Sequence, residues 1–186
     1  MPVFVVCFKW VVDEAYIRKD SSGGLDFSSV DYKIGEYDRN AIEEAVRLKE
    51  ALGGQVLAVT AGTPEATKGV KDALSRGADQ AFFACDPSFN NLDPSQTASI
   101  LSQIIRRWIP SYNLILCGEG SSDQYSQQVG PRIAETLGIP CLSFVQKIAL
   151  QEREIIIERR IEEGIEVLSA PLPALVTVLP DINVPR

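Results

Sequence analysis

The residues with the clearest chemical potential lie in one polar segment, Gly118-Glu119-Gly120-Ser121-Ser122-Asp123-Gln124-Tyr125-Ser126-Gln127-Gln128-Val129-Gly130-Pro131. Its small residues let the backbone approach a ligand closely, and its polar side chains supply many hydrogen-bond donors and acceptors. A helix is expected to follow, and its first main-chain N–H groups, which have no helical partner, would attract phosphate. A polar loop in which Ser and Gln side chains cap the helix explains the same residues, so both interpretations stay open.

Other kinds of site are not indicated by this segment. It lacks the Gly-Lys-Ser/Thr of a Walker loop, and no Gly-x-Gly-x-x-Gly follows the first apolar run of the chain. Asp123 has no recognisable acid–base partner, so we interpret it as a loop or capping carboxylate. No catalytic residue is therefore predicted.

The composition removes several classes of chemistry. The 186 residues include no histidine, which excludes His general-base catalysis, Ser/His/Asp and Cys/His nucleophile systems, and most zinc sites. Asp and Glu outnumber Lys and Arg by 25 to 18, and the net charge of -7 makes nucleic acid a poor partner. No Cys-x-x-Cys pair occurs, so we predict neither a zinc knuckle nor a redox pair and expect reduced thiols at Cys7, Cys85, Cys117 and Cys141. The first three end apolar runs, and we interpret them as small, buried, inert side chains rather than a cluster site.

Length and hydropathy predict one domain over residues 1–186. With 45% hydrophobic and 23% charged residues, the chain can bury a single core without disulfides or metals. No apolar run approaches the roughly 20 residues of a membrane span, and no basic segment precedes the apolar start. We therefore expect a cytoplasmic protein with no membrane partner.

Apolar runs alternate with helical segments along the chain. The runs are short and continuous, which is typical of strands buried on both faces, and they cover residues 3–8, 56–59, 81–85, 114–117 and 175–178. One helix is indicated by an apolar stripe from Ala41 to Leu52, with Glu43, Glu44, Arg47 and Glu50 largely on its other side. Trp10 and Trp108 are interpreted as packing residues.

Helix ends are marked by capping residues. Thr63-Pro64 predicts an N-cap followed by proline at the first helical position, and Gly77 stands where the C-terminal cap is expected. Asp93-Pro94-Ser95-Gln96 predicts a capping box. The helix after the polar segment should run from about Gln128 to Leu137 and end at Gly138.

These units predict an α/β fold with a doubly wound parallel sheet and helices on both faces. Two β-hairpin excursions interrupt it, at residues 10–37 around Asp20-Ser21-Ser22-Gly23-Gly24 and at residues 146–170 around Glu163-Gly164. In the second, the alternation of Ile155 and Ile157 with glutamates indicates one solvated face. Ligands of such sheets bind beyond the carboxyl ends of the strands, near the switch point of strand order, and the polar segment follows one such end.

Five motifs in order resemble the β subunit of electron transfer flavoprotein. They are Phe8-Lys9-Trp10-Val11-Val12-Asp13, the helix from Asp38 to Glu50, the segment from Asp72 to Asp79, the set Gly118, Asp123, Gln128 and Gly130 followed by Leu137-Gly138-Ile139-Pro140, and the last segment with Leu172-Pro173-Ala174-Leu175-Val176-Thr177 and Asn183-Val184-Pro185-Arg186. Each is short, but five at the family's spacing are specific. The resemblance extends from the first strand to the last residue.

The resemblance implies a Rossmann-like domain that binds an adenine nucleotide, AMP in ordinary members and a second FAD in the electron-bifurcating group. In the family, the phosphate contacts main-chain N–H groups that align with Gln127, Gln128 and Val129. These residues lie at the helix start that the polar segment already indicated as a phosphate site. Adenine and ribose contacts fall on Cys7, on Ala61 and on the loop from Gly118, which includes the motif residues Asp123 and Gly130. Gln128-Val129-Gly130-Pro131 is closer to the bifurcating group, so both AMP and FAD stay open.

Some residues depart from the family pattern. Gly35-Glu36 replaces an Asn-Pro pair that contacts the nucleotide, and Tyr125 replaces a loop carboxylate, which would change charge and bulk beside the phosphate. The family's dehydrogenase-docking loop and wrapping arm would follow Arg186, so those two functions are not carried over.

Two functions are compatible with these residues. In the first, the protein supports flavin-based electron transfer with an α-like partner subunit, and the redox chemistry belongs to flavin. In the second, it is a stand-alone adenine-nucleotide-binding protein with no redox role. A thiol enzyme is disfavoured because no histidine can activate cysteine. An α-like subunit would contact the domain surface alone, and self-association as a homodimer through the open edges of the two hairpins is expected otherwise.

Overall fold

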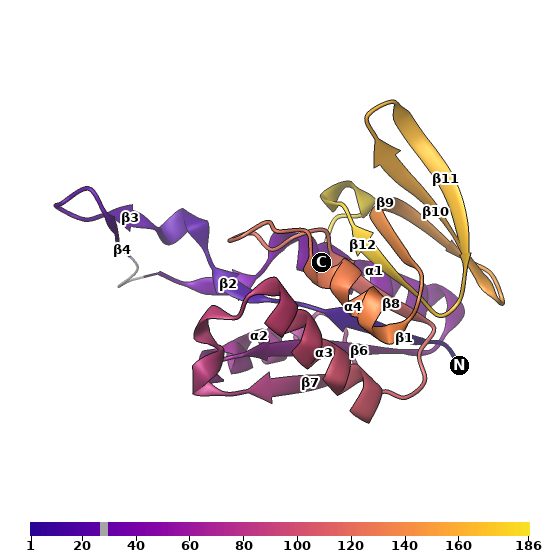
Figure 1. Cartoon of the computed structure of the whole chain (residues 1–186), viewed down its shortest axis with the longest axis horizontal. Coiled ribbons are helices and arrows are strands. Elements are labelled where there is room, and N and C mark those ends of the chain that lie inside the picture. The colour runs from indigo at the N-terminus through magenta and orange to yellow at the C-terminus, as the bar shows by residue number, and fades with distance from the viewer. Residues whose placement is uncertain (27–29) are drawn as a thin grey trace.

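One sheet organises the part of the chain that the structure, a computed structural model, describes: residues 1–26 and 30–186. Its strands are β1 (Val3–Cys7), β6 (Gln55–Gly62), β7 (Gln80–Cys85), β8 (Leu114–Gly118), β9 (Cys141–Leu150), β10 (Glu154–Ile161), β11 (Gly164–Pro171) and β12 (Ala174–Val178). Across the sheet they follow the order β11-β10-β9-β12-β8-β1-β6-β7 (Figure 1). Neighbouring strands are parallel from β9 to β7, and β10 and β11 extend the sheet as an antiparallel hairpin.

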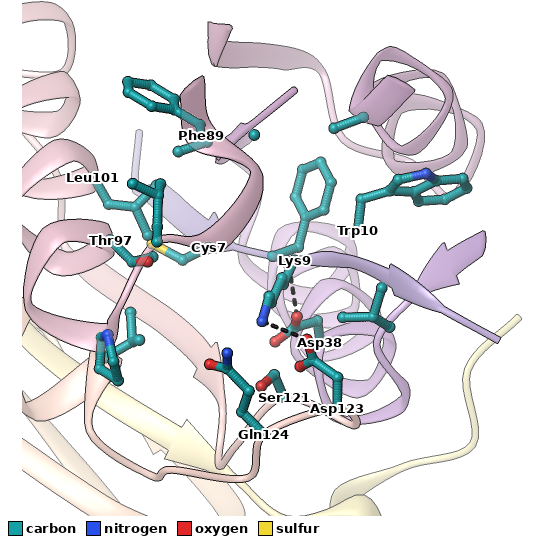
Figure 2. Close-up of a pocket in the computed structure, with 18 of the residues that line it drawn as sticks. Cys7, Lys9, Trp10, Asp38, Phe89, Thr97, Leu101, Ser121, Asp123 and Gln124 are labelled. Atoms are coloured by element: carbon teal, nitrogen blue, oxygen red, sulfur yellow. Dashed lines mark hydrogen bonds and ion pairs between the residues drawn. The ribbon is translucent and has the colours of Figure 1, made fainter. Parts of the chain in front are cut away.

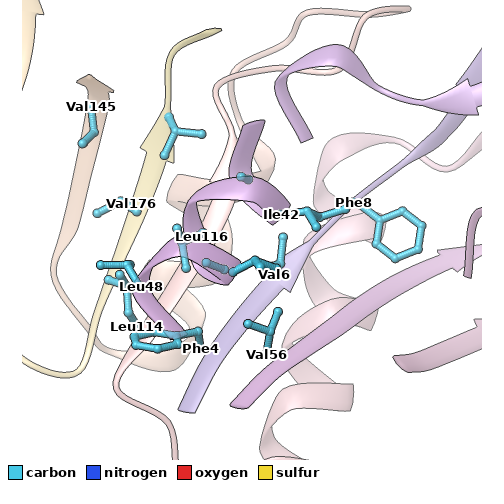
Figure 3. Packing of buried hydrophobic residues seen from close by; sticks show 14 of the residues in the cluster. Phe4, Val6, Phe8, Ile42, Leu48, Val56, Leu114, Leu116, Val145 and Val176 are labelled. Carbon is cyan, nitrogen blue, oxygen red and sulfur yellow. The ribbon is translucent and has the colours of Figure 1, made fainter. Parts of the chain in front are cut away.

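Helices cover both faces of this sheet and create two cores. They are α1 (Glu36–Leu52), α2 (Thr67–Ser75), α3 (Pro94–Trp108) and α4 (Val129–Leu137). Phe4 and Val6 of β1 belong to the core that α1 and α2 cover (Figure 3). Val5 and Cys7 belong to the core that α3 and α4 cover. A continuous apolar strand is needed for this two-sided burial. The predicted α/β, doubly wound fold is confirmed.

Strand β7 departs from the expected two-sided burial. It lies at the edge of the sheet with β6 as its only strand neighbour in the described ranges, and its residues are partly exposed. Cys85 at its end is exposed, so the prediction of a buried thiol there is wrong. Position in the sheet, which an apolar run does not encode, is the physical reason.

Most of the predicted helix ends are confirmed. The Asp93 carboxylate accepts hydrogen bonds from the N–H groups of Ser95 and Gln96, and the Gln96 side chain completes the capping box at α3. Gly138 ends α4 in the left-handed conformation. Thr63 makes no capping bond, because its hydroxyl donates to Glu65, and α2 begins only after a short 3₁₀ turn. No helix within the described ranges has the length and apolar character to cross a membrane.

Trp108 shows where a packing prediction fails. It is the last residue of α3 and is 58% exposed, with the Arg107 guanidinium 5.3 Å from its ring centre. Trp10, by contrast, packs against the core as expected. The helical period places Trp108 on one stripe with Leu101 and Ile105, which are buried, but at the last position of the helix this period does not ensure burial.

Both hairpin excursions are present. The first consists of two small sheets, β2 (Trp10–Val12) with β5 (Tyr32–Ile34), and β3 (Arg18–Lys19) with β4 (Leu25–Asp26), and it projects from the body (Figure 1). Residues 27–29 of this predicted excursion lie outside the described residues. The second hairpin, β10 with β11, continues the main sheet, and Ile155 and Ile157 are buried as expected.

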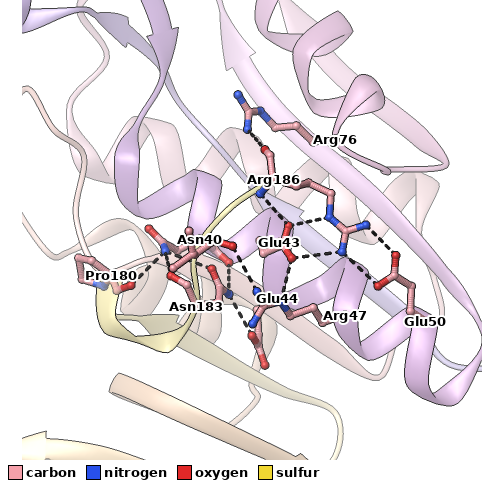
Figure 4. Close-up of polar contacts among 10 residues, drawn as sticks. Asn40, Glu43, Glu44, Arg47, Glu50, Arg76, Pro180, Asn183 and Arg186 are labelled. Carbon is pink, nitrogen blue, oxygen red and sulfur yellow. Dashed lines mark hydrogen bonds and ion pairs between the residues drawn. The ribbon is translucent and has the colours of Figure 1, made fainter.

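The last residues of the chain are tied to α1 (Figure 4). Asn183 exchanges hydrogen bonds with Asn40, and the Arg186 guanidinium binds the carboxylates of Glu43 and Glu50. The helical pattern had placed Glu43 opposite the apolar stripe, where a solvated side chain is expected. In the structure Glu43 is buried instead. Burial raises the cost of its charge, but the hydrogen bonds from Arg186 and Arg47 lower its pKa to about 2.

Candidate functional site

A pocket of about 850 Å³ opens where the order of strands reverses (Figure 2). From β1 the chain proceeds outward through α1 to β6 and then β7, and it returns through α3 to β8 on the other side of β1. The helices that follow β1 and β8 leave toward opposite faces, which opens a crevice at the carboxyl ends of these strands. The pocket occupies this crevice.

The pocket is lined by all eight residues that the sequence nominated. Cys7, Ala61 and Gly118 come from the ends of β1, β6 and β8. The loop after β8 and the first turn of α4 supply Asp123, Gln127, Gln128, Val129 and Gly130. The fold thus brings together residues more than a hundred positions apart, and their contact with a nucleotide stays a prediction.

The start of α4 presents unused main-chain donors. Gln128 stands at the N-cap, but its side chain accepts no main-chain N–H of the helix, because its Oε1 accepts instead from the Arg132 guanidinium at 2.8 Å. Among the described residues, the N–H groups of residues 127–130 have no hydrogen-bond partner. The side-chain capping interpretation is therefore wrong, and free donors remain at the edge of the pocket where an anion would be attracted.

Gly130 lets α4 lie close to the sheet. A Cβ at this position would lie 2.6 Å from Cγ2 of Thr177 in β12 and 3.4 Å from Cδ2 of Leu175. The first contact is well inside the ordinary carbon–carbon separation of about 3.5–4.0 Å. The glycine therefore decides where the first turn of α4, and its free donors, are placed.

Two carboxylates and one amine define the electrostatics beside these donors (Figure 2). The ammonium of Lys9 lies 2.6 Å from Asp123 Oδ2. Burial opposes ionisation of Asp123, but the hydrogen bonds from Lys9 and Ser121 outweigh it and lower its pKa. Asp38, at the start of α1, accepts the N–H groups of Lys9 (2.8 Å) and Gly118 (3.2 Å), yet burial raises its pKa to about 7.

The balance of charge in the pocket is acidic. Lys9 is the one basic side chain among the described lining residues, and it is already paired with Asp123. Asp38, Glu65 and Glu119 add further carboxyl groups. An anion bound here would therefore depend on main-chain N–H groups more than on a free side-chain cation.

The buried thiols do not form a reactive centre. Cys7 and Cys117 lie opposite each other on the adjacent strands β1 and β8, and both are buried. The hydrogen bond between the two thiols and their burial raise the pKa of Cys117 well above its usual value, which keeps the less nucleophilic protonated form. Within residues 1–26 and 30–186 no group of three or more carboxylates or thiols is arranged to hold a metal ion.

Sequence reasoning missed several residues of the pocket. Phe89 and Leu101 line its apolar side, and Lys9, Asp38 and Glu119 line its polar side. Lys9 and Asp38 lie within quoted motifs, which was a signal that could have placed them here. Phe89 belongs to a short 3₁₀ segment with no motif, so only the fold identifies it.

Tyr125 acts differently from the expectation that it adds bulk beside the phosphate site. It is not among the residues that line the pocket, and its ring lies 5.5 Å from that of Tyr37. Its hydroxyl donates to Glu119, and this hydrogen bond, together with desolvation and the charge of Glu119, raises the pKa of Tyr125 to about 12. The departure from the family pattern at this position therefore changes how the loop is held rather than what the pocket contains.

The sequence matches the family model of the electron transfer flavoprotein domain over residues 23–186. The match begins near the tip of the first hairpin and includes α1, β6, β8, the loop after β8 and α4. It leaves β1 outside, so the pocket contributions of Cys7 and Lys9 rest on the fold and on the first quoted motif.

Proposed function

Since the chain belongs to the electron transfer flavoprotein domain family, we propose that it binds an adenine nucleotide, AMP or FAD, and supports flavin-based electron transfer with an α-like partner subunit. The observation that supports the nucleotide site is the set of N–H groups at residues 127–130, which have no hydrogen-bond partner in the described part of the chain and belong to residues that line the switch-point pocket. Main-chain donors at a helix start suit a phosphate group.

The remaining lining of the pocket suits a nucleoside. Phe89, Leu101, Thr97 and Cys7 lie together on one side of it, away from Lys9 and Asp123 (Figure 2). Purine bases bind well against apolar and aromatic surfaces, and ribose hydroxyls suit the polar side. The volume of about 850 Å³ lies within the range of about 300–1,000 Å³ that is usual for small-molecule sites.

Residues of this chain would bind and orient the nucleotide rather than perform redox chemistry themselves. A bound flavin supplies electron-transfer chemistry, whereas the protein controls its position and electrostatics. The acidic lining near Asp38 and Glu119 would disfavour added negative charge on the ligand, and raising the pH through about 7 would ionise Asp38. We therefore expect nucleotide affinity to decrease as the pH rises from 6 to 8.

Strand β11 offers a surface for a partner chain. It is one of the two edge strands of the sheet, so one row of its backbone groups is open to pairing with another strand. Ile165 and Val167 on this strand are exposed. We propose that an α-like subunit binds here, and a second copy of this chain is the competing occupant. Light scattering during size exclusion distinguishes a mixed complex, a homodimer and a concentration-independent monomer, the last of which contradicts both.

The nucleotide proposal has a direct test. The absorption spectrum of the purified protein is recorded, and the nucleotide released by heat is identified. A flavin spectrum supports the electron-transfer role, and colourless protein that releases AMP supports nucleotide binding without its own flavin. Protein that releases nothing and binds neither added AMP nor added FAD contradicts the proposal.

A further inference from the structure

A buried carboxylate holds the loop between β8 and α4. Glu119 directly follows β8, and its residue surface is 6% exposed. Its Oε1 accepts hydrogen bonds from the Tyr125 hydroxyl and from Nε2 of Gln127, the latter at 2.6 Å. Its Oε2 is buried without a hydrogen-bond partner among the described residues. One oxygen of a single carboxylate thus serves two side chains of the same loop.

The two residues tied to Glu119 are also those that the loop forces into an unfavourable backbone conformation. Tyr125 has φ 46° and Gln127 has φ 57°, in the left-handed region that non-glycine residues rarely adopt. Such conformations persist only where surrounding contacts impose them. The bonds to Glu119 are contacts of this kind, and the bond at Gln127 lies at the first of the free N–H groups.

A second contact seats Tyr125 independently of the carboxylate. The Tyr125 ring lies so close to Gly120 that a Cβ there would be 2.8 Å from its Cδ2 atom. The ring of Tyr37 packs on the same tyrosine at 5.5 Å between centroids. The loop is therefore held at Tyr125 by packing and at Gln127 by its bond to Glu119.

We propose that Glu119 is a positioning residue that aims the N–H groups of residues 127–129 into the pocket, and so gives the site its preference for a phosphorylated nucleotide over the nucleoside. The inference rests on the proposed nucleotide binding. A negative charge near an anion site repels the anion, so the benefit of Glu119 must come through geometry rather than charge.

A pair of substitutions separates geometry from charge. Glu119→Gln keeps the Oε1 acceptor, and its amide nitrogen takes the place of Oε2, which has no partner to lose. Glu119→Leu fills similar space but binds neither Tyr125 nor Gln127. AMP and adenosine affinities are measured by titration calorimetry for both variants and the unaltered chain. Glu119→Gln should bind AMP at least as tightly as the unaltered chain. Glu119→Leu should bind AMP at least about tenfold more weakly, because one or more charge-assisted bonds between main-chain N–H groups and the phosphate would be lost. Its adenosine affinity should be unchanged.

Gly120→Ala provides a variant that leaves the carboxylate intact. The added methyl group would displace the Tyr125 ring, so AMP affinity should fall while adenosine affinity holds. This variant also covers the case in which Glu119→Leu does not fold. A general loss of structure would weaken both ligands and lower the thermal midpoint, which distinguishes it from a repositioned loop.

A ligand-free measurement keeps the inference testable if the proposed function fails. Chymotrypsin cleaves after Tyr125 only when the loop opens, and the fragment that begins at Ser126 identifies this cut by mass spectrometry. Cleavage should be slow in the unaltered chain and in Glu119→Gln, and at least about tenfold faster in Glu119→Leu, since local opening governs the rate. If the unaltered chain binds neither ligand, nucleotide binding is wrong, while this comparison still decides whether Glu119 holds the loop.

Two results would overturn the inference. In one, Glu119→Leu retains both the AMP-to-adenosine affinity ratio and the slow cleavage of the unaltered chain. In the other, Glu119→Gln and Glu119→Leu tighten AMP binding equally, which would mean that the carboxylate acts only as a repelling charge.

Discussion

Replacing Gly130 by alanine tests whether close packing of α4 on the sheet places the anion-binding donors. The new Cβ would lie 2.6 Å from Cγ2 of Thr177, whose residue surface is 3% exposed. Carbon atoms in ordinary contact are about 3.5–4.0 Å apart, so the helix start or the strand must move by about 1 Å. Since β12 is buried between two neighbours, we expect the first turn of α4 to move.

The size of the effect follows from this displacement. Overpacking costs about 1–3 kcal/mol, and replacing glycine by alanine within a helix returns about 1 kcal/mol, so the free energy of unfolding should fall by about 0–2 kcal/mol. A shift of about 1 Å would stretch an N–H···O distance beyond the roughly 3.2 Å limit of a good hydrogen bond. Losing one bond to a charged group costs about 1.5–3 kcal/mol, which corresponds to about 10–150-fold weaker AMP binding.

A double-mutant cycle supplies the matched control. Thr177→Ser removes the Cγ2 atom and keeps the hydroxyl that accepts the Phe144 N–H at 3.4 Å. Calorimetric AMP affinity and urea unfolding are measured for Gly130→Ala, Thr177→Ser and the double variant. The double variant should recover most of the affinity lost in Gly130→Ala, whereas Gln128→Ala should change affinity little because its donor is the main chain.

Either of two results would contradict this role of Gly130. Unchanged AMP affinity in Gly130→Ala would show that the helix start does not set the donor positions. Weak binding that Thr177→Ser does not restore would show that the contact with Cγ2 is not the cause.

Three further predictions concern charge and thiol reactivity. Burial raises the Asp38 pKa from 3.8 to about 7, so between these pH values the folded state binds a proton that the unfolded state has lost. The free energy of unfolding should therefore decrease from pH 4 to pH 7 by up to about 4 kcal/mol. In Asp38→Asn the free energy of unfolding, measured with urea, should depend less on pH over this range. The Glu43 pKa is lowered from 4.5 to about 2, despite burial, by Arg186 and Arg47, so its stabilisation is complete above pH 4.5 and is lost as the pH falls toward 2. Glu43→Gln should lower the free energy of unfolding at pH 7 by about 1–3 kcal/mol, a range that is reduced because the Arg186 side chain is half exposed to solvent. If the variant lost stability below pH 4.5 as steeply as the unaltered chain does, Glu43 would not be the cause of that loss. A thiol reagent should modify Cys85 and Cys141 in the folded protein and the two buried thiols only after unfolding, as peptide mapping would reveal.

The sequence by itself determined the elements and their order. Continuous apolar runs predicted β1, β6, β8 and β12, because a strand buried on both faces needs apolar residues at every position. The capping box at Asp93 and the terminal Gly138 marked helix ends, because they satisfy backbone groups within a few residues. The loop after β8 was predicted as a ligand site because parallel strands place such loops at a common edge, and ligand binding there stays a prediction.

The tertiary structure alone decided which side chains meet. Glu43 follows the solvated side of its helical pattern but is buried by Arg186, which lies 143 positions away. Lys9 pairs with Asp123 across 114 positions, and Phe89 reaches the pocket from a segment without a motif. The left-handed Tyr125 and Gln127 and their shared partner Glu119 likewise have no local signal, since the polar composition of the loop is compatible with many conformations. Local sequence controls backbone propensity and capping, whereas pairing of distant polar groups depends on how the sheet and helices pack.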